Sequence, residues 1–291
     1  MPKIAYIEKS FQKKRLDLIS RSNSIIAEYA EQGFTLTLRQ LYYQLVSRDV
    51  IPNSQTEYKK LSATISDARL AGLLDWAAIV DRTRGLRSNS HWDKPADILE
   101  SAIASYRIDK WADQPRRPEV WIEKDALIGV IEGVCSDLDV AYFAARGYNS
   151  QSEMWATGRK FAKYLRIGQV PIIFHLGDHD PSGLDMTRDI IERLALFVGQ
   201  DIEVKRLALN FNQVERYAPP PNPTKLTDSR AGPYLDEFGG SSWELDALSP
   251  AIIADLITEA IESVRDENLW QAATAREEEE IQSLRDLIEQ L

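Results

Sequence analysis

The sequence of 291 residues contains one cysteine, Cys135, and three histidines. A single cysteine excludes a disulfide framework and a thiolate zinc cluster, and three histidines are too few and too scattered for a histidine metal site. The sequence also lacks an apolar run near the ~18 residues that cross a bilayer, and its first residues contain no apolar signal-peptide segment. We therefore expect a soluble, cytoplasmic protein that does not bind membranes.

The composition is that of a folded protein with an uneven charge distribution. Hydrophobic residues make up 44% of the chain and charged residues 27%, which excludes disordered and low-complexity classes. At roughly 150 residues per domain, the length suggests about two domains. The net charge is −10, but residues 1–120 carry 19 Lys and Arg against 15 Asp and Glu, and residues 121–291 carry 16 against 30. This asymmetry fits a basic DNA-facing module joined to an acidic one, although an ordinary uneven surface fits it as well.

Three helices are expected near the N-terminus, over residues 22–32, 37–51 and 54–70. An apolar strand at 76–80 and a turn-rich basic loop at 81–90 follow them. This order of elements is that of a winged helix-turn-helix.

Residues 1–110 are therefore predicted to form a winged-helix domain that binds double-stranded DNA. Phosphate contacts dominate affinity for DNA, and basic residues of the third helix and the loop suit such contacts. The candidates are Lys59, Lys60, Arg69, Arg82, Arg84 and Arg87. The alternative is a small helical domain with a solvated basic face.

From residue 119 on, short apolar strands alternate with helices, after a linker at 111–118. The strands are expected at 120–122, 140–143, 170–174 and 202–209. The first strand is followed by a helix that ends near 137, the second by a helix at 151–166 and the third by a helix at 183–197. This alternation predicts an α/β domain, residues 119–218, in which a parallel sheet has helices on both faces. The proline-rich run at 219–223 breaks the pattern. Residues 219–291 are expected to be a helical extension of the same domain, with 277–280 on a solvated helix face.

Acidic side chains follow two of the expected strands. Glu123 comes directly after the first strand, and Asp178 and Asp180 come after the third. In a doubly wound sheet the functional groups gather beyond the carboxyl ends of the strands. Three carboxylates with few nitrogen or sulfur ligands suit Mg²⁺. A turn or a helix cap would explain a lone Asp-x-Asp, but Glu123 together with this pair favours a shared metal site.

A second set of residues lies on the helix that opens at Thr37. Tyr42 falls on its apolar stripe and is expected in the core, whereas Tyr43 is expected to be exposed. Arg39 precedes Tyr43 by four residues and therefore lies on the same face. A phenol has an ordinary pKa near 10, so a nucleophilic tyrosine needs a cation or a base nearby. An amphipathic tyrosine at a domain edge is the commoner explanation of such a residue.

Together these residues resemble the A subunit of type IIB DNA topoisomerase (topoisomerase VI) and its relative, the meiotic double-strand-break transesterase. Segment 38–43 is similar to the catalytic helix of that family's winged-helix domain, and 121–127 is similar to the first strand and acidic residue of its TOPRIM domain. Segments 145–148 and 177–183 resemble the family's glycine–tyrosine segment and its Asp-x-Asp metal motif. Segment 243–248 resembles a C-terminal acidic motif more weakly.

The resemblance implies a Mg²⁺-dependent transesterase in which Tyr43 attacks a DNA phosphodiester and Arg39 stabilises charge on the phosphate. Glu123, Asp178 and Asp180 would hold the Mg²⁺. In that family the tyrosine of one protomer works with the metal of the other, which implies a homodimer. The family's ATP-binding module lies on a separate B subunit and is not part of this chain. We expect a small, stand-alone relative of the family, and whether it passes one DNA strand through another is an open question. Two alternatives remain: a TOPRIM endonuclease that activates water, and a DNA-binding protein without catalysis.

Overall fold

The computed structural model describes residues 3–79, 89–145, 147–225 and 227–289. Its centre is a four-stranded sheet in which all neighbouring strands are parallel, in the order β2-β1-β3-β4. The strands are β1 (Arg116–Ile122), β2 (Ala141–Ala144), β3 (Val170–Leu176) and β4 (Glu203–Ala208). The expected α/β class with a parallel sheet is therefore confirmed.

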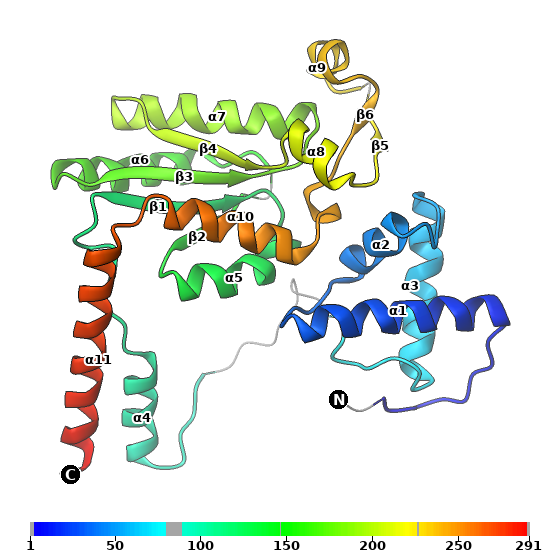
Figure 1. Cartoon of the computed structure of the whole chain (residues 1–291), viewed down its shortest axis with the longest axis horizontal. Helices are drawn as coiled ribbons and strands as arrows, with labels where there is room; N and C mark the ends of the chain where they lie inside the picture. Colours follow the sequence, from blue (N-terminus) through cyan, green and yellow to red (C-terminus); the bar gives the residue numbers. More distant parts are fainter. Residues whose placement is uncertain (1–2, 80–88, 146, 226, 290–291) are drawn as a thin grey trace.

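Helices cover both faces of this sheet (Figure 1). One face is covered by α5 (Ile128–Asp137) and α10 (Pro250–Glu262), the other by α6 (Gln151–Arg166) and α7 (Pro181–Val198). Side chains alternate along a strand, so Val120 and Ile122 enter the core under α5 and α10, and Trp121 enters the core under α6 and α7. Because α10 shares the core of the sheet, the C-terminal part is built into this domain.

The remaining C-terminal elements lie around the carboxyl edge of the sheet and along one side (Figure 1). They are α8 (Phe211–Tyr217), β5 (Asn222–Pro223), α9 (Ala231–Phe238), β6 (Ser241–Ser242), η2 (Leu245–Ala247) and α11 (Glu267–Glu289), whereas the short η1 (Asp125–Leu127) follows β1. Strands β5 and β6 form a small antiparallel pair. Helix α11 runs beside α4 (Pro95–Ser105).

The N-terminal part contains α1 (Lys13–Glu31), α2 (Leu38–Ser47) and α3 (Gln55–Leu70) around their own core. Thr37 caps α2 in a reciprocal capping box with Gln40, which fixes where this helix begins. Helix α1 begins nine residues earlier than expected. Its N-cap, Gln12, makes no side-chain capping bond, so the sequence gives no signal at its start.

The strand expected at 76–80 is wrong over its described residues. Trp76 and Ala77 form a turn in which the Asp75 carboxylate accepts a hydrogen bond from the Ala77 amide at 2.8 Å. Among residues 76–79, only Ile79 forms a backbone bridge to another segment, with Leu36. The loop that would form the wing, 81–88, lies outside the described residues, so the winged-helix expectation stays a prediction.

Two further expectations are corrected by buried contacts. The expected linker is packed: Trp111 is buried and its indole donates to the Leu138 carbonyl at 2.9 Å, while β1 already begins at Arg116. Glu277, expected on a solvated face, is also buried. Its carboxylate accepts from the Ile108 amide at 2.9 Å and pairs with Lys110 at 3.0 Å, so it anchors α11 to the segment before β1.

Packing of α6 on α7 makes a specific demand on Gly158, because a Cβ built there would lie 2.6 Å from Phe197 Cβ. We expect Gly158→Ala to lower the free energy of unfolding by about 1–3 kcal/mol through overpacking. Gly133 of α5 is the matched control: its Cβ would meet nothing within 4 Å, so Gly133→Ala should stabilise by roughly 0.5–1 kcal/mol. Urea unfolding measures both, and equal effects would contradict the α6–α7 packing.

Candidate functional site

The site lies where the chain reverses its direction of travel across the sheet. From β1 the chain moves outward to β2, and it then returns to place β3 on the other side of β1. The carboxyl ends of β1 and β3 are therefore adjacent, and such a switch point is where ligands bind in open α/β sheets. The Glu123 amide donates to the Leu176 carbonyl, and the Asp178 amide donates to Glu123 Oε2, both at 2.9 Å. The two predicted acidic positions are thus in direct contact.

Asp180 follows at the start of α7, where it is the N-cap. Its Oδ1 accepts from the Gly183 amide at 2.6 Å and from the Ser182 hydroxyl at 3.0 Å. Gly183 permits this tight turn, since a Cβ there would lie 2.2 Å from the Asp178 carbonyl oxygen. Gly183 thus allows the backbone of Asp178 to approach closely.

His179 points away from its two aspartate neighbours, as alternation along extended backbone requires. It is buried among aromatic rings, including those of Phe238 at 4.7 Å and Trp243 at 5.7 Å, and burial lowers its pKa to about 4. Its backbone also pairs with that of Trp243 through bonds of 2.8 and 2.9 Å. This anchor brings the segment after β6, including Glu244, beside Asp178.

Lys124 lies at the centre of the resulting acidic cluster, which consists of Asp178, Glu244 and Asp246. Its ammonium group lies 2.8 Å from Asp178 Oδ1, 2.8 Å from Glu244 Oε2 and 3.1 Å from Asp246 Oδ1. Burial opposes the charge of Lys124, but the three carboxylates outweigh it and raise its pKa. The same attraction lowers the pKa of Glu244 to about 2, against the effect of burial.

The tyrosine helix contacts this cluster through Arg39. The Arg39 guanidinium pairs with Glu244, and its Nε lies 2.8 Å from Asp246 Oδ2. It also lies over the Tyr43 ring, 5.7 Å from the centroid, as the four-residue spacing predicts. The structure thus brings Arg39 and Tyr43 of α2 to the edge of the sheet that carries Glu123 and Asp178.

Tyr43 is buried, which corrects the expectation of an exposed side chain. Only 4% of it is accessible, the same as for Tyr42. The segment around Asn222 is held beside the N-terminal part by Asn53, which donates to the Pro221 carbonyl at 2.9 Å and to Asn222 Oδ1 at 2.8 Å. The Asn222 side chain lies near the Tyr43 hydroxyl and slightly opposes the rise in its pKa. Burial, and to a smaller degree the charges of Glu244 and Asp246, raise the pKa of the phenol to about 12.

The three predicted metal ligands lie close together, and each has one carboxylate oxygen that accepts no hydrogen bond from a described residue. Glu123 Oε2 and Asp180 Oδ1 accept the hydrogen bonds described above, and Asp178 Oδ1 accepts from the Leu245 amide at 2.8 Å. The second oxygen of each carboxylate is the one that makes no hydrogen bond with a described residue. Burial raises the pKa of Glu123, and raises that of Asp178 to about 7. A bound cation would offset this cost of burying carboxylates.

Their placement does not form a complete ligand cage. Within the described part of the chain, no three acidic, histidine or cysteine side chains stand so that one ion could contact all of them. Mg²⁺ commonly binds one or two carboxylates and completes its shell with water and phosphate oxygens, so the donors present fit it. A cavity of about 170 Å³ reaches Asp178, Asp180, Asn222 and Glu244, and it offers room for such a group.

The predicted DNA contacts are placed only in part. Lys59 is exposed on α3, and Lys60 is exposed and pairs with Glu57 at 2.7 Å. Arg69 is turned toward the protein, where it donates to the Ile79 carbonyl and lies 5.9 Å from the centroid of the Trp76 ring. The three loop residues Arg82, Arg84 and Arg87 lie outside the described residues.

The sequence assigned no individual role to Lys124, Glu244 or Asp246, although segment 243–248 resembles a C-terminal acidic motif. Their signal was present, because Lys124 adjoins Glu123, and Glu244 and Asp246 repeat the Asp-x-Asp spacing. Arg206 had no such signal. Its half-buried side chain donates to the Gly177 carbonyl at 3.0 Å and the Gly183 carbonyl at 2.9 Å, which fixes the loop that carries Asp178 and Asp180.

No protein-family model and no curated protein matches this sequence. Among the described residues, the structure has no helix that is both long and apolar enough to cross a membrane.

A double-mutant cycle tests the contact between α2 and the acidic cluster. We expect Arg39→Gln and Glu244→Gln to show a coupling of about 0.5–1 kcal/mol in the free energy of unfolding, since Arg39 is 46% exposed and its pairing is screened by water. Arg48 and Glu28, a pair within the N-terminal part at 2.8 Å, provide the matched cycle. Strictly additive effects for Arg39 and Glu244 would mean that α2 is not docked there.

Proposed function

We propose that the chain is a Mg²⁺-dependent DNA-cleaving transesterase of the type IIB topoisomerase A-subunit kind. The observation that carries this proposal is the meeting of two sets of residues from distant parts of the sequence. Arg39 and Tyr43 of α2 lie against Glu244 and Asp246, which Lys124 joins to Asp178 at the switch point of the sheet. A tyrosine, an arginine and a group of carboxylates at one edge are what phosphoryl transfer to a phenol requires.

In the proposed step the Tyr43 phenolic oxygen attacks a DNA phosphorus. A phosphorus–oxygen bond to tyrosine forms and the phosphorus–oxygen bond to deoxyribose breaks. The phenol loses its proton, and the departing sugar oxygen gains one and leaves as a hydroxyl. Arg39 stabilises negative charge on the phosphate. Because one ester replaces another, the step is reversible, and strand passage would need further movements.

Of Glu123, Asp178 and Asp180, one or two would hold the ion directly through their spare oxygens, and the rest would contact it through water. When bound, Mg²⁺ supplies positive charge at a phosphate oxygen during transfer. Lys124 and Arg206 fix the carboxylate-bearing segments from either side, so these segments are ordered by the protein itself. The acidic lining of the cavity at Asp178 needs such a cation before DNA phosphate can approach.

The proposed partner is double-stranded DNA, bound by a homodimer. A single chain already places the tyrosine helix against its own acidic cluster, so a dimer could use either its own or its partner's cluster. An ATPase subunit of the B type is a further proposed partner, because strand passage in the resembled family depends on one.

Burial of Tyr43 favours a second candidate, a metal-dependent endonuclease in which activated water cuts DNA. A phenol whose pKa is about 12 is almost fully protonated at neutral pH. In this alternative Tyr43 only packs between Arg39 and Asn222, and the carboxylates alone support the chemistry.

Covalent attachment separates these two functions. We expect wild-type protein, incubated with supercoiled DNA and Mg²⁺ and then denatured, to remain linked to DNA, and Tyr43→Phe to lower this linkage by roughly three orders of magnitude or more. Tyr58→Phe is the control, since Tyr58 is a half-buried tyrosine of the same core. A Tyr43→Phe protein that cuts at the full rate without attachment would establish the endonuclease.

The variant Asp180→Asn distinguishes the two proposed enzymatic functions, transesterase and endonuclease, from DNA binding without catalysis. Asparagine caps helices as well as aspartate does, so the variant should keep its stability. We expect it to lose Mg²⁺-dependent cleavage and bind Mg²⁺ more weakly in calorimetry, while its affinity for DNA is kept. If the wild type neither cleaves DNA nor binds Mg²⁺, only the DNA-binding function remains.

A further inference from the structure

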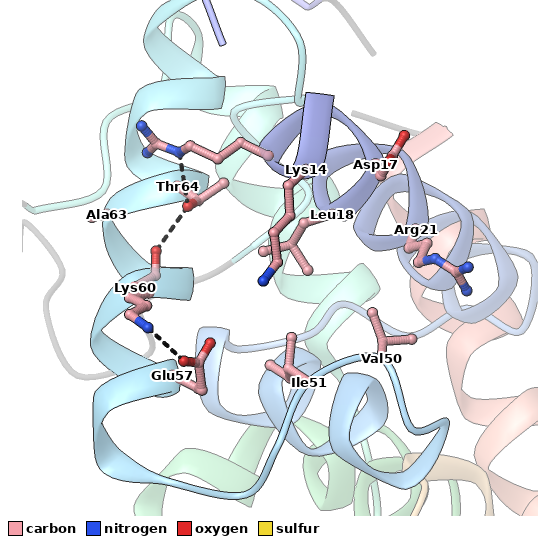
Figure 2. Close-up of a pocket in the computed structure, with 11 residues that line it drawn as sticks. Lys14, Asp17, Leu18, Arg21, Val50, Ile51, Glu57, Lys60, Ala63 and Thr64 are labelled. Carbon is pink, nitrogen blue, oxygen red and sulfur yellow. Dashed lines mark hydrogen bonds and ion pairs between the residues drawn. The ribbon is translucent and has the colours of Figure 1, made fainter. Parts of the chain in front are cut away.

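A second cavity lies in the N-terminal part of the chain, between α1 and α3 (Figure 2). Its volume is about 580 Å³, which is within the range of roughly 300–1,000 Å³ found for small-molecule sites. The described residues that line it include none of the residues proposed to cleave DNA. The cavity is therefore a candidate site of its own.

Basic side chains surround this cavity. Lys14, Arg15 and Arg21 come from α1 and Lys60 comes from α3. Arg15 and Lys60 are held by carboxylates at 2.9 and 2.7 Å, whereas Lys14 and Arg21 are exposed and form no ion pair with a described residue. Figure 2 shows Lys14 extending into the space between the two helices. Lys14 is thus available to an anionic group in this space, and Arg21 is a second such cation about two turns farther along α1 (Figure 2).

The inner surface of the cavity is apolar. Leu18 of α1 and Val50 and Ile51 from the connection between α2 and α3 are half-buried and face this space (Figure 2). An inorganic anion would leave this surface in contact with water. A molecule that combines a flat, weakly polar ring with an anionic group would cover the apolar surface and reach the cations at once.

We propose that this cavity binds a nucleoside phosphate, with its phosphate at Lys14 and Arg21 and its base on Leu18, Val50 and Ile51. Asp17 and Glu57 also line the cavity, and their carboxylates accept hydrogen bonds, which suits a base that carries an amino group. The same chemistry is offered by a free nucleotide and by an unpaired residue of a DNA strand. This proposal does not depend on the cleavage proposed above.

Calorimetry with four probes on the full chain tests the proposal and separates the two sources. We expect adenosine 5′-monophosphate or a single-stranded hexamer of deoxyadenylate to saturate one site. Adenosine and inorganic phosphate should each bind at least about tenfold more weakly, because each lacks one half of the contacts. If the monophosphate binds, the ligand of the cavity is a free nucleotide. If only the hexamer binds, the ligand is a residue of a DNA strand. If inorganic phosphate binds as tightly as the monophosphate, or if neither nucleotide probe saturates, the proposal is wrong.

Paired variants locate the site. Lys14→Gln with Arg21→Gln should raise the dissociation constant of the saturating probe by about tenfold or more. Lys13→Gln with Lys163→Gln removes the same charge from exposed residues that do not line the cavity, and it should change the constant less than about twofold. All four residues are exposed, so thermal unfolding should confirm that both proteins stay folded. Equal weakening by the two pairs would mean that the probe responds to overall charge, which would overturn the proposal.

Discussion

The ammonium group of Lys124 is the contact on which the candidate site depends. It lies within 3.1 Å of carboxylates from three positions, Asp178, Glu244 and Asp246, which would otherwise repel one another in a buried setting. Lys124 follows β1, Asp178 follows β3, and the other two flank or belong to η2. One side chain thus joins the two central strands to the C-terminal segment. Arg39 extends this network to α2, so it ties the helix of the proposed nucleophile to residues that Lys124 holds.

This network also explains why the tyrosine is closed off. Arg39 is engaged by Glu244 and Asp246, and the Asn222 side chain lies near the Tyr43 hydroxyl. Under the proposed mechanism, a DNA phosphate has to take over the contacts that Arg39 makes with these carboxylates. The carboxylates of Glu244 and Asp246 raise the pKa of the phenol in the present arrangement. Once Arg39 is released from them, its guanidinium would favour the phenolate. Cleavage would therefore require DNA binding to be coupled to a shift of α2 away from the Asn222 segment.

Much of the sheet and part of the site could be predicted from the sequence. Apolar runs and their alternation with helices located all four strands, and the position of Glu123 and Asp178 after strands placed them at one edge. The burial of Tyr43 could not be predicted, because helical periodicity describes one helix and the Asn222 segment comes to it from far away in the sequence. The turn at Trp76 was missed because the Asp75 side chain overrides an apolar run. Long-range pairing also explains Glu277, whose partners come from the segment before β1.

Anomalous diffraction from a crystal soaked in Mn²⁺ is the most direct test of the central claim, that the acidic residues at the carboxyl ends of β1 and β3 form one cation site. The account predicts one strong manganese peak within coordination distance of Asp178 or Asp180, on the side of their free oxygens, with Glu123 contributing directly or through water. A well-ordered crystal with no peak at this edge, or with manganese bound only elsewhere, would contradict it.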